Sequence, residues 1–446
     1  MRWARLLFTV LSLLLVGLVG ASNAAFVATD PGARGGAPGG GDPLPGLTTG
    51  QLALFKAGML EFTSAEDVSD GLGPRFNLDS CAGCHAQPGP GGSSPSRNPQ
   101  AELVQTYPNN ALPSFLSADG PVREVRFKRK PDGTPDGGVH SLFVIDSGIT
   151  QEDFEAEYAR NNIIFRIPSP VFGGGLIEQI PDGAIAANQQ TNLGSKSFLG
   201  IRGRINRLNV SGDFNKNGND GTIARFGWKA QNKSLLLFGA EAYNVEMGIS
   251  NELFQTEREE ATACQHAPVP NDTTDTETLD LSRGLSGIEK FAFFMRFLAP
   301  PVPSPDTPGG AGSIAQGQAL FGSVGCALCH TPTLQTGNSS VAALNSQPVN
   351  LYSDLLLHNM GSNLADGVSQ GEAGPDEFRT APLWGLGQRI FFLHDGRTSD
   401  LVDAIQGHQG PGNWRTQPSE ANAVVNNFNV LPEQQKQDLL NFLRSL

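Results

Sequence analysis

The sequence of 446 residues predicts a mainly α-helical protein built from two domains of similar plan, with a partly β insertion in the first. Three observations lead to this prediction. A Cys-x-x-Cys-His motif occurs once in each half of the chain, at Cys81–His85 and at Cys326–His330. Each half closes with an amphipathic helical pattern, and runs of alternating apolar residues follow the first motif. A chain of this length is expected to form two or three domains.

The two Cys-x-x-Cys-His motifs indicate covalently bound haem. Their spacing lets the two thiols form thioethers to the two vinyl groups of one haem, while the imidazole of the next residue ligates the iron. The residues concerned are Cys81, Cys84 and His85 in the first motif, and Cys326, Cys329 and His330 in the second. Zinc or thiol–disulfide chemistry is the alternative, but structural zinc takes four ligands at other spacings. We therefore predict two haem c groups and electron-transfer chemistry.

Each half of the chain repeats one helical plan. A helical segment precedes each haem motif, at 48–62 and at 313–321. An amphipathic helix ends each half, at 287–298 and at 432–446, and Pro432 suits the first turn of the latter. A terminal helix packed across an N-terminal helix, with Cys-x-x-Cys-His between them, is the plan of cytochrome c. The fold class is therefore predicted as two tandem cytochrome c-like haem domains.

The part of the chain between about 100 and 225 interrupts this helical plan. It contains alternating runs at 122–128 and 142–145, and turn-rich segments at 173–175 and 215–219. We predict a partly β insertion that shapes a pocket over the first haem. A set of surface loops without special function is the alternative.

Changes in composition give the domain boundaries. The predicted parts are a signal peptide at 1–24, a Gly- and Pro-rich linker at 25–46, an N-terminal haem domain at 47–300, a second linker at 301–312 and a C-terminal haem domain at 313–446. Within the first linker, the Gly- and Pro-rich composition of residues 31–46 predicts disorder.

The first residues are organised like an export signal. Arg2 and Arg5 form a positive n-region, an apolar stretch from Leu6 to Gly20 follows, and small residues lead to a cleavage site after Ala24. The apolar stretch is short for a membrane span, and an uncleaved anchor is the alternative. We expect a periplasmic protein without an integral membrane span after processing, because bacterial haem c is attached outside the cytoplasmic membrane.

The charge of the chain restricts its partners. The formal net charge is −13, and the loss of Arg2 and Arg5 with the signal peptide takes it to −15. A chain this acidic is not expected to bind nucleic acid. It can dock with a basic electron donor, for which we expect a small c-type cytochrome or a cupredoxin.

Two features of the sequence have open interpretations. Cys264, the one cysteine outside the haem motifs, lies near His266 and is either a reactive or pairing thiol or a cysteine without consequence. The segment Asp-Phe-Asn-Lys-Asn-Gly at 213–218 matches the opening of a calcium loop, but its twelfth position is Ala224 instead of glutamate. A plain turn is the stronger interpretation, which makes calcium a doubtful cofactor.

Several segments resemble the superfamily of bacterial di-haem cytochrome c peroxidases and methylamine-utilisation oxidoreductases. Within it, the chain is most similar to the branch of di-haem oxidoreductases, also labelled thiol oxidoreductases. The matching segments are FGWKA at 226–230, EMG at 246–248, HNMG at 358–361, FRTAPLW at 378–384 and HDGR at 394–397. Together with both haem motifs they extend over most of residues 48–446. They are specific for the superfamily and much less so for the reaction.

The resemblance implies different roles for the two haems. In the family the C-terminal haem receives electrons and has six ligands, whereas the N-terminal haem meets peroxide. The family's sixth ligand is a methionine fourteen residues after the histidine of the His-Asp-Gly motif, and here this position is His408. A bis-histidine haem should have a lower reduction potential than a His/Met haem. His358 and Met360 are competing ligands, although structural roles are the stronger interpretation for both.

The resemblance also places Glu246 over the N-terminal haem as a distal carboxylate. Heterolytic cleavage of an O–O bond needs a base that takes a proton from the near oxygen and returns it to the leaving oxygen. Burial can give a carboxylate a suitable pKa for this role. A solvated helix glutamate is the alternative, and Met247 is expected to pack. Of the two tryptophans in matching segments, Trp228 is a stronger candidate for an electron relay than Trp384, and packing is the alternative for both.

The chain departs from the family in three places. The histidine that closes the peroxide site in many peroxidases, about sixteen residues after the first motif, corresponds here to Ala101. We therefore expect an open first haem, unless His140 or His266 reaches it. The insertion before Glu246 is far longer than in typical peroxidases. The Thr-x-Pro that helps bind calcium in the family is replaced by Arg-Ile-Phe at 389–391, so that calcium site is not expected here.

The sequence therefore predicts a periplasmic di-haem c-type oxidoreductase. It would reduce hydrogen peroxide at the N-terminal haem with electrons that enter through the C-terminal haem. His85 and His330 are the predicted proximal ligands, His408 the distal ligand of the second haem, and Glu246 the catalytic residue. One alternative is an oxidase that modifies a protein or organic substrate bound to the insertion. Another is a non-enzymatic electron-transfer cytochrome in which both irons have six ligands.

Overall fold

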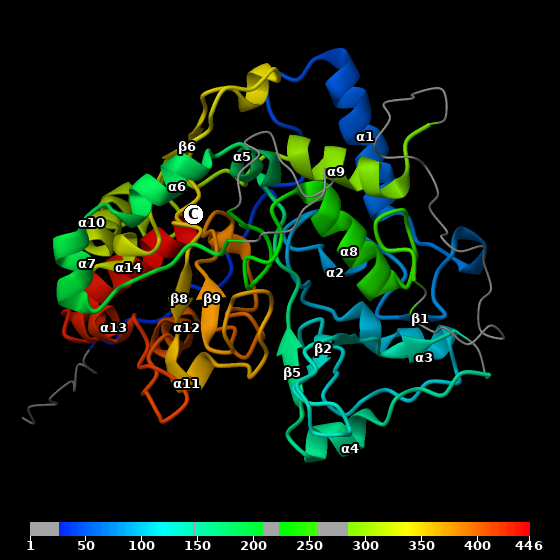
Figure 1. Cartoon of the computed structure of the whole chain (residues 1–446). Coiled ribbons are helices and arrows are strands. Elements are labelled where there is room, and N and C mark those ends of the chain that lie inside the picture. Colours follow the sequence, from blue (N-terminus) through cyan, green and yellow to red (C-terminus); the bar gives the residue numbers. More distant parts are fainter. Residues whose placement is uncertain (1–25, 146–147, 208–222, 257, 259–283) are drawn as a thin grey trace, which may run out of the picture.

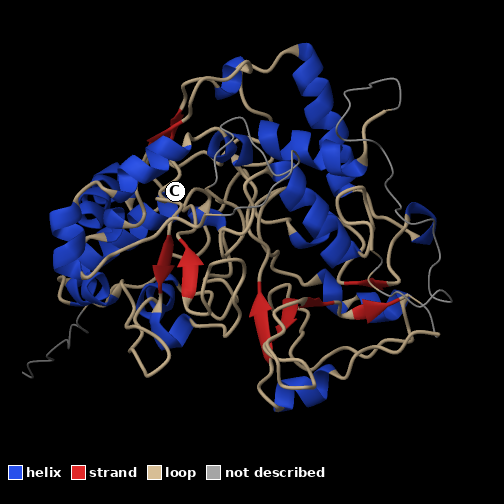
Figure 2. Cartoon of the chain, in the orientation of Figure 1, coloured by secondary structure: helices blue, strands red, loops and turns tan. Residues whose placement is uncertain are grey.

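The structure, a computed structural model, describes residues 26–145, 148–207, 223–256, 258 and 284–446. The predicted signal peptide, Cys264, His266 and the segment 213–218 lie outside the described residues. The described chain is rich in helices and has short strands, as the predicted mainly α class requires (Figure 2). None of the described helices is both long enough and apolar enough to cross a membrane.

The helices are α1 (Thr49–Thr63), α2 (Cys81–Cys84), α3 (Leu103–Thr106), α4 (Phe154–Ala159), α5 (Gly174–Glu178), α6 (Asp182–Gln189), α7 (Leu193–Leu199), α8 (Leu235–Met247), α9 (Gly287–Phe297), α10 (Gly310–Val324), α11 (Gly361–Leu364), α12 (Leu401–Gly407), α13 (Asn422–Asn429) and α14 (Glu433–Ser445). Short 3-10 helices lie at Val68–Asp70, Pro99–Ala101, Cys326–Leu328, Ala342–Leu344 and Leu386–Gln388. The strands are β1 (Arg75–Phe76), β2 (Glu124–Phe127), β3 (Val139–His140), β4 (Phe143–Val144), β5 (Ile163–Arg166), β6 (Leu334–Gln335), β7 (Pro348–Val349), β8 (Leu357–Asn359) and β9 (Glu377–Arg379).

Helices α1, α8 and α9 pack together in the N-terminal half (Figure 1). Helix α1 crosses α9 so closely that a Cβ atom at Gly58 would lie 2.2 Å from the carbonyl oxygen of Lys290. Only glycine permits this approach, because any side chain would overlap the main chain of α9. Beside the crossing, Phe55 and Phe62 pack against Phe294 with ring centroids 5.5 and 4.7 Å apart.

Helices α10 and α14 repeat this crossing in the C-terminal half. A Cβ atom at Gly317 would lie 2.0 Å from the carbonyl oxygen of Asp438. Phe321 of α10 meets Phe442 of α14 edge-on, with ring centroids 5.5 Å apart. The four helices predicted before the haem motifs and at the ends of the halves are thus present. The division of the chain into tandem domains stays a prediction.

A three-stranded antiparallel sheet follows the first haem motif in sequence, with the strand order β3-β2-β5. In its central strand, Val125 and Phe127 belong to the N-terminal apolar core, while Glu124 and Arg126 alternate with them. The register places Glu124 opposite Arg166 of β5. The alternating run at 122–128 therefore forms a strand in the structure. The same part of the chain also contains helices α3 to α7, so it is a mixture of both kinds of structure.

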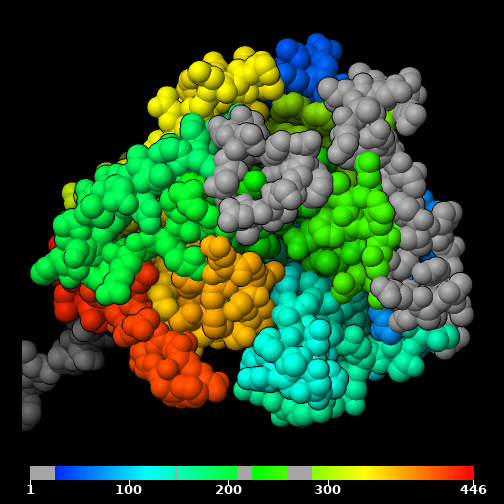
Figure 3. All heavy atoms as spheres, viewed as in Figure 1, coloured from blue at the N-terminus to red at the C-terminus, as the bar shows by residue number. Residues whose placement is uncertain are grey.

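Helices α6 and α7 lie against the C-terminal half, although they precede α8 in sequence (Figures 1 and 3). Asn188 of α6 donates a hydrogen bond to the hydroxyl of Thr331, next to the second haem motif. After α7, Ile201 belongs to the C-terminal apolar core, and the main-chain N–H groups of Arg202 and Gly203 donate to the carboxylate of Glu420. The C-terminal group of helices is therefore completed by the first half of the chain.

The segment from 26 to 46 lies along both halves of the protein, which differs from the disorder predicted for residues 31–46. Within that range, the N–H of Arg34 donates to the carbonyl of Gly387. The carboxylate of Asp30 accepts a hydrogen bond from Nε of Arg444 at 2.7 Å, and Arg444 is only 1% exposed. The N–H of Ala28 donates to Glu433 at 2.8 Å. Further along, the N–H of Leu44 donates to the carbonyl of Phe297 at 2.7 Å. These contacts with distant residues order a sequence that lacks local structure of its own.

Replacing Asp30 by alanine should destabilise the protein by about 3 kcal/mol, because the Arg444 guanidinium would stay buried without its counter-ion. Burial alone would raise the pKa of Asp30, but hydrogen bonds from Arg444 and from the N–H of Gly32 hold it below its usual value. The loss of stability in Asp30→Ala should therefore be largest near neutral pH, and it should decrease as the pH falls through the pKa of Asp30 in the folded state. Thermal unfolding followed by circular dichroism at several pH values measures it. Asp42→Ala, on an exposed residue of the same segment, is the control, and an equal effect of both variants would contradict this prediction.

Candidate functional site

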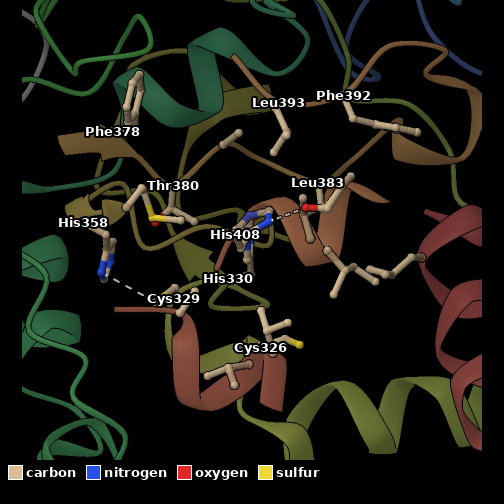
Figure 4. Close-up of a pocket in the computed structure, with 18 of the residues that line it drawn as sticks. Cys326, Cys329, His330, His358, Phe378, Thr380, Leu383, Phe392, Leu393 and His408 are labelled. Carbon is tan, nitrogen blue, oxygen red and sulfur yellow. Dashed lines mark hydrogen bonds between the residues drawn. The ribbon is translucent and has the colours of Figure 1, made fainter. Parts of the chain in front are cut away.

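Two cavities open beside the two Cys-x-x-Cys-His motifs. The first, of about 150 Å³, contains Cys81, Cys84 and His85 in its wall and lies between α8, α9 and the sheet formed by β2 and β5. The second, of about 220 Å³, is lined by Cys326, Cys329 and His330 and by residues of α12, α13 and α14 (Figure 4). We call them the first and the second cavity.

His85 is held in a form suited to ligate iron. It follows the single turn α2, which begins at Ser80, whose hydroxyl accepts the N–H of Gly83. The Nδ1 of His85 lies 3.0 Å from the carbonyl oxygen of Gly92. Because a carbonyl can only accept, Nδ1 carries the proton and Nε2 keeps the lone pair that an iron needs. Burial lowers the pKa of His85 to about 4, which favours the neutral ring.

His330 repeats this arrangement in the second cavity. Its Nδ1 donates to the carbonyl oxygen of Tyr352 at 3.0 Å. Burial, followed by the nearby His408, lowers the pKa of His330 to about 4. The four cysteines of the two motifs are not joined in disulfides. Each cavity therefore offers two thiols, one neutral imidazole and a largely apolar wall, and these residues fit a covalently bound haem.

His408 lies in the same cavity as His330, as Figure 4 shows. It caps the C-terminal end of α12, where its Nδ1 donates to the carbonyl oxygen of Ala404 at 2.7 Å. This bond leaves the lone pair of Nε2 free, and burial lowers the pKa of the ring. The structure thus brings the two histidines to one cavity, and ligation of one iron by both stays a prediction.

His358, the competing ligand, has both ring nitrogens engaged. Its Nε2 lies 2.9 Å from the carboxylate of Asp354, and its Nδ1 lies 2.7 Å from the carboxylate of Glu420. Burial would lower the pKa of His358, but the Cys329 sulfur and Asp354 together raise it well above its usual value. A ring that donates from both nitrogens has no lone pair for iron, so His358 has a structural role here. Met360 lines the second cavity.

Glu246 lies in the last turn of α8 and lines the first cavity together with His85. Its carboxylate accepts a hydrogen bond from Nδ2 of Asn77 at 2.7 Å. Burial, and then the neighbouring carboxylate of Glu124, raise the pKa of Glu246 to about 8. Glu124 raises the pKa of Glu246 and Glu246 lowers that of Glu124, so the two carboxyl groups titrate as one pair.

Glu124, Arg126 and Arg166 were missed by the sequence reasoning. All three line the first cavity. Arg126 and Arg166 hold the pKa of Glu124 below its usual value in spite of its burial. The alternation Glu-Val-Arg at 124–126 could have predicted a charged pair, because it places two charged side chains on one face of a strand. Their meeting with Arg166 depends on the pairing of β2 with β5, which the local sequence does not specify.

In many peroxidases of the family a histidine closes the peroxide site, and the structure has a glutamine in the corresponding part of the first cavity. Gln100, and not its neighbour Ala101, lines the first cavity. Gln100 is fixed by hydrogen bonds to the main chain of Arg123, with Nε2 donating to the carbonyl oxygen at 2.9 Å. His140 of β3 is bound by Glu152 and Asp136 and does not line this cavity. Among the described residues, His85 is the one histidine of the first cavity.

Trp228 lines both cavities. Its indole Nε1 donates to the carbonyl oxygen of Ile167 at 2.9 Å, and its ring meets His394 edge-on with centroids 6.4 Å apart. Trp384 lines neither cavity and packs in the N-terminal apolar core against Gly173. The structure therefore assigns packing to Trp384 and leaves Trp228 as the relay candidate.

The described residues contain no group of three or more His, Cys, Asp or Glu side chains arranged to hold a metal ion. The candidate calcium segment 213–218 lies outside them.

Comparison with known proteins gives one family match. The model of the family described as "Di-haem oxidoreductase, putative peroxidase" matches residues 146–446. This range contains the second haem motif, Glu246 and Trp228, and it begins after the first haem motif. No match was found among curated proteins.

Likenesses to solved structures are distant. Hydrazine synthase of Kuenenia stuttgartiensis is 13% identical over 100% of both chains, with a TM-score of 0.35. The diheme peroxidase BthA of Burkholderia thailandensis is 16% identical over 73% of this chain and 93% of its own, with a TM-score of 0.29. A MauG-like protein associated with microbial copper homeostasis is 17% identical over 63% of this chain and 89% of its own, also with a TM-score of 0.29.

Proposed function

Because the chain belongs to the family of di-haem oxidoreductases, we propose that it reduces hydrogen peroxide in the periplasm. Peroxide would react at the haem held by Cys81, Cys84 and His85. Electrons would enter through the haem of the second cavity from a small c-type cytochrome or a cupredoxin. The observation that carries this proposal is the position of Glu246, whose pKa is raised to about 8, in the cavity that contains His85.

The residues of the first cavity are suited to move protons during O–O cleavage. A haem bound there would supply an iron site for peroxide and electrons for its reduction. Near neutral pH the pair of Glu246 and Glu124 holds one proton and has room for a second, because one carboxyl has a raised pKa and the other a lowered one. The ionised carboxyl can therefore take a proton from the near oxygen of peroxide while the protonated carboxyl gives its proton to the leaving oxygen. Proton exchange between the two carboxyl groups then restores the pair.

The other polar groups of the cavity keep this pair in place. Asn77 orients Glu246 through the hydrogen bond from its Nδ2. Arg126 forms an ion pair with Glu124, which favours the ionised form of that carboxyl. The positive charge of Arg126 also favours negative charge that develops on the oxygens during bond cleavage. Glu124 and Arg126 are thus part of the proposed proton-transfer site together with Glu246.

Trp228 is the proposed path for electrons between the two haems, since it lines both cavities. Replacing it by phenylalanine keeps an aromatic ring in place and removes the more easily oxidised indole. We expect electron transfer between the haems to slow by on the order of tenfold, equivalent to about 1.4 kcal/mol in the barrier. Stopped-flow spectroscopy after rapid reduction of the second haem measures this rate. Trp414→Phe, at an 84% exposed residue, is the matched control. Equal rates in the two variants would remove Trp228 from the path.

Electron paramagnetic resonance of the protein, before and after addition of one electron per chain, tests the proposed function directly. We expect a high-spin ferric signal that persists in the half-reduced protein, since the described residues provide one histidine to the first cavity. Mass spectrometry of the denatured chain should show two haems still attached. Low-spin signals alone in both states, together with no reaction with peroxide, would instead support an electron-transfer cytochrome. An open haem that reacts slowly with small donors would support an oxidase of a protein or organic substrate.

A further inference from the structure

Two buried arginines line the second cavity. Arg379 ends β9, and Arg389 follows the turn at 386–388; each is 8% exposed. The two guanidinium groups are close enough to influence each other, because the charge of Arg389 contributes to the lowered pKa of Arg379. Burial lowers the pKa of both arginines to about 10, and for Arg379 it is a larger cause than the charge of Arg389. Two cations therefore share one wall of the cavity that contains His330.

The other arginines that are buried in the described part of the chain have carboxylate partners. These ion pairs are Arg126 with Glu124, Arg166 with Asp366, Arg225 with Asp182 and Arg444 with Asp30. Such partners are expected, because a buried charge without a counter-ion costs several kcal/mol. Among the described residues, no carboxylate pairs with Arg379 or Arg389.

Several N–H groups of the two guanidinium groups form no hydrogen bond with the described residues. Arg379 donates from Nε to the carbonyl oxygen of Gly227 at 2.8 Å, and from one terminal nitrogen to the carbonyl of Thr380 at 3.4 Å. The described residues offer no hydrogen-bond acceptor to the guanidinium of Arg389. A guanidinium carries five N–H donors in a planar fork, which matches the two oxygens of a carboxylate. The cavity wall therefore presents positive charge and N–H donors to whatever fills the cavity.

We propose that Arg379 and Arg389 together bind the propionate carboxylates of the haem in the second cavity. A haem brings two carboxylates, and these would supply the counter-ions that the protein itself does not provide. This inference rests on the proposed binding of a haem at Cys326, Cys329 and His330, and it is independent of the reaction at the first cavity.

The propionate site is joined to the proposed electron path through the main chain. The N–H of Arg379 donates to the carbonyl oxygen of Trp228 at 2.9 Å, and its Nε binds the carbonyl of the preceding Gly227. Trp228 lines both cavities. Arg379 thus holds the main chain at Gly227 and Trp228, and in this proposal it also holds a propionate.

The test is the reduction potential of the second haem in Arg389→Gln holoprotein, measured by spectroelectrochemistry without peroxide. A positive charge near the haem favours the ferrous state, so its removal should lower the potential. We expect the ratio of ferrous to ferric haem at a fixed solution potential to fall roughly tenfold, as for the loss of one partly buried unit charge; for a one-electron couple this is about 59 mV. Resonance Raman bands of the propionate groups should shift as well. Arg389→Lys should restore much of the potential, because it keeps the charge.

Arg415→Gln is the matched control, since it removes the same charge from an exposed arginine in the same half of the chain. The potential of the first haem in each variant serves as an internal reference. An unchanged potential and unchanged propionate bands in Arg389→Gln would overturn the proposal.

If this variant does not accumulate with haem, a crystal structure of the wild-type holoprotein decides. Propionate oxygens within hydrogen-bond distance of both guanidinium groups support the proposal, and propionates turned away from them overturn it. None of these outcomes depends on peroxide turnover, so a failure of the proposed peroxidase activity would be recognised separately.

Discussion

Replacing Glu246 by glutamine should lower peroxide-dependent turnover by about 10²–10⁴-fold, the range of a lost general acid–base catalyst. Glutamine has nearly the same shape and can still accept the hydrogen bond from Asn77. It has no acidic proton to give to the leaving oxygen, and it cannot receive one from Glu124. Steady-state turnover with a small reduced donor measures the effect, and the haem content should equal that of the wild type.

The pH dependence of this reaction follows from the same pair of carboxyl groups. Above about pH 8 the pair loses the resident proton that it gives to the leaving oxygen, so wild-type turnover should fall there. In Glu246→Gln the residual activity should lack this alkaline decline. The apparent pKa belongs to the pair of Glu246 and Glu124 and not to one residue. An alkaline decline that persists in the variant would assign it to another group.

Stability gives an independent measurement on the same variant. A carboxyl whose pKa is raised from 4.5 to about 8 binds more protons in the folded than in the unfolded state between these values. The stability of the wild type should therefore decrease as the pH rises through this range. Glutamine does not ionise, so Glu246→Gln should be more stable than the wild type at pH 8, by on the order of 4 kcal/mol. Glu102→Gln, at an exposed residue, should change neither turnover nor stability. Full turnover of Glu246→Gln would remove Glu246 from the proposed mechanism.

Replacing His408 by methionine should raise the reduction potential of the second haem by on the order of 0.1–0.2 V, since a His/Met haem favours the ferrous state. Electron transfer from this haem to the first would then lose driving force, and turnover limited by that step should slow. Potentiometric titration followed in the visible spectrum measures the shift, and near-infrared absorption identifies the ligand pair.

The structure offers a close control for the His408 variant. Gln409→Met changes the next side chain, whose amide donates to Asn426, and should leave the potential unchanged. An unchanged potential in His408→Met would show that His408 is not the ligand. Met360, which also lines the second cavity, would then be replaced by leucine in the same assay.

The parts of the fold that the sequence predicted well depend on residues close together in the chain. The haem motifs are contiguous, and α9 and α14 follow from apolar periodicity within single segments. The placement of His408 beside His330 was inferred from resemblance, and the geometry of α12 agrees with it. Glu124 and Arg166 were missed because they meet through the pairing of two strands about 40 residues apart.

The interpretation of residues 26–46 failed for a related reason. Gly and Pro composition reports the local preference of a chain, which here is for no regular structure. The order of the segment comes from partners such as Glu433 and Arg444, which no local pattern connects to Ala28 or Asp30. Composition alone therefore predicts that the segment has no helices or strands. It does not predict that contacts with distant residues hold the segment in one place.

The ion pair of Asp30 and Arg444 joins residues that are 414 positions apart. Synthesis proceeds from the N-terminus, so Asp30 is made long before its partner. Residues 28–30 cannot reach their final place until α14 exists and has packed on α10. Their docking is therefore a late step of assembly, and loss of Arg444 would leave Asp30 without its partner while residues 39–44 keep their contacts with 297–302.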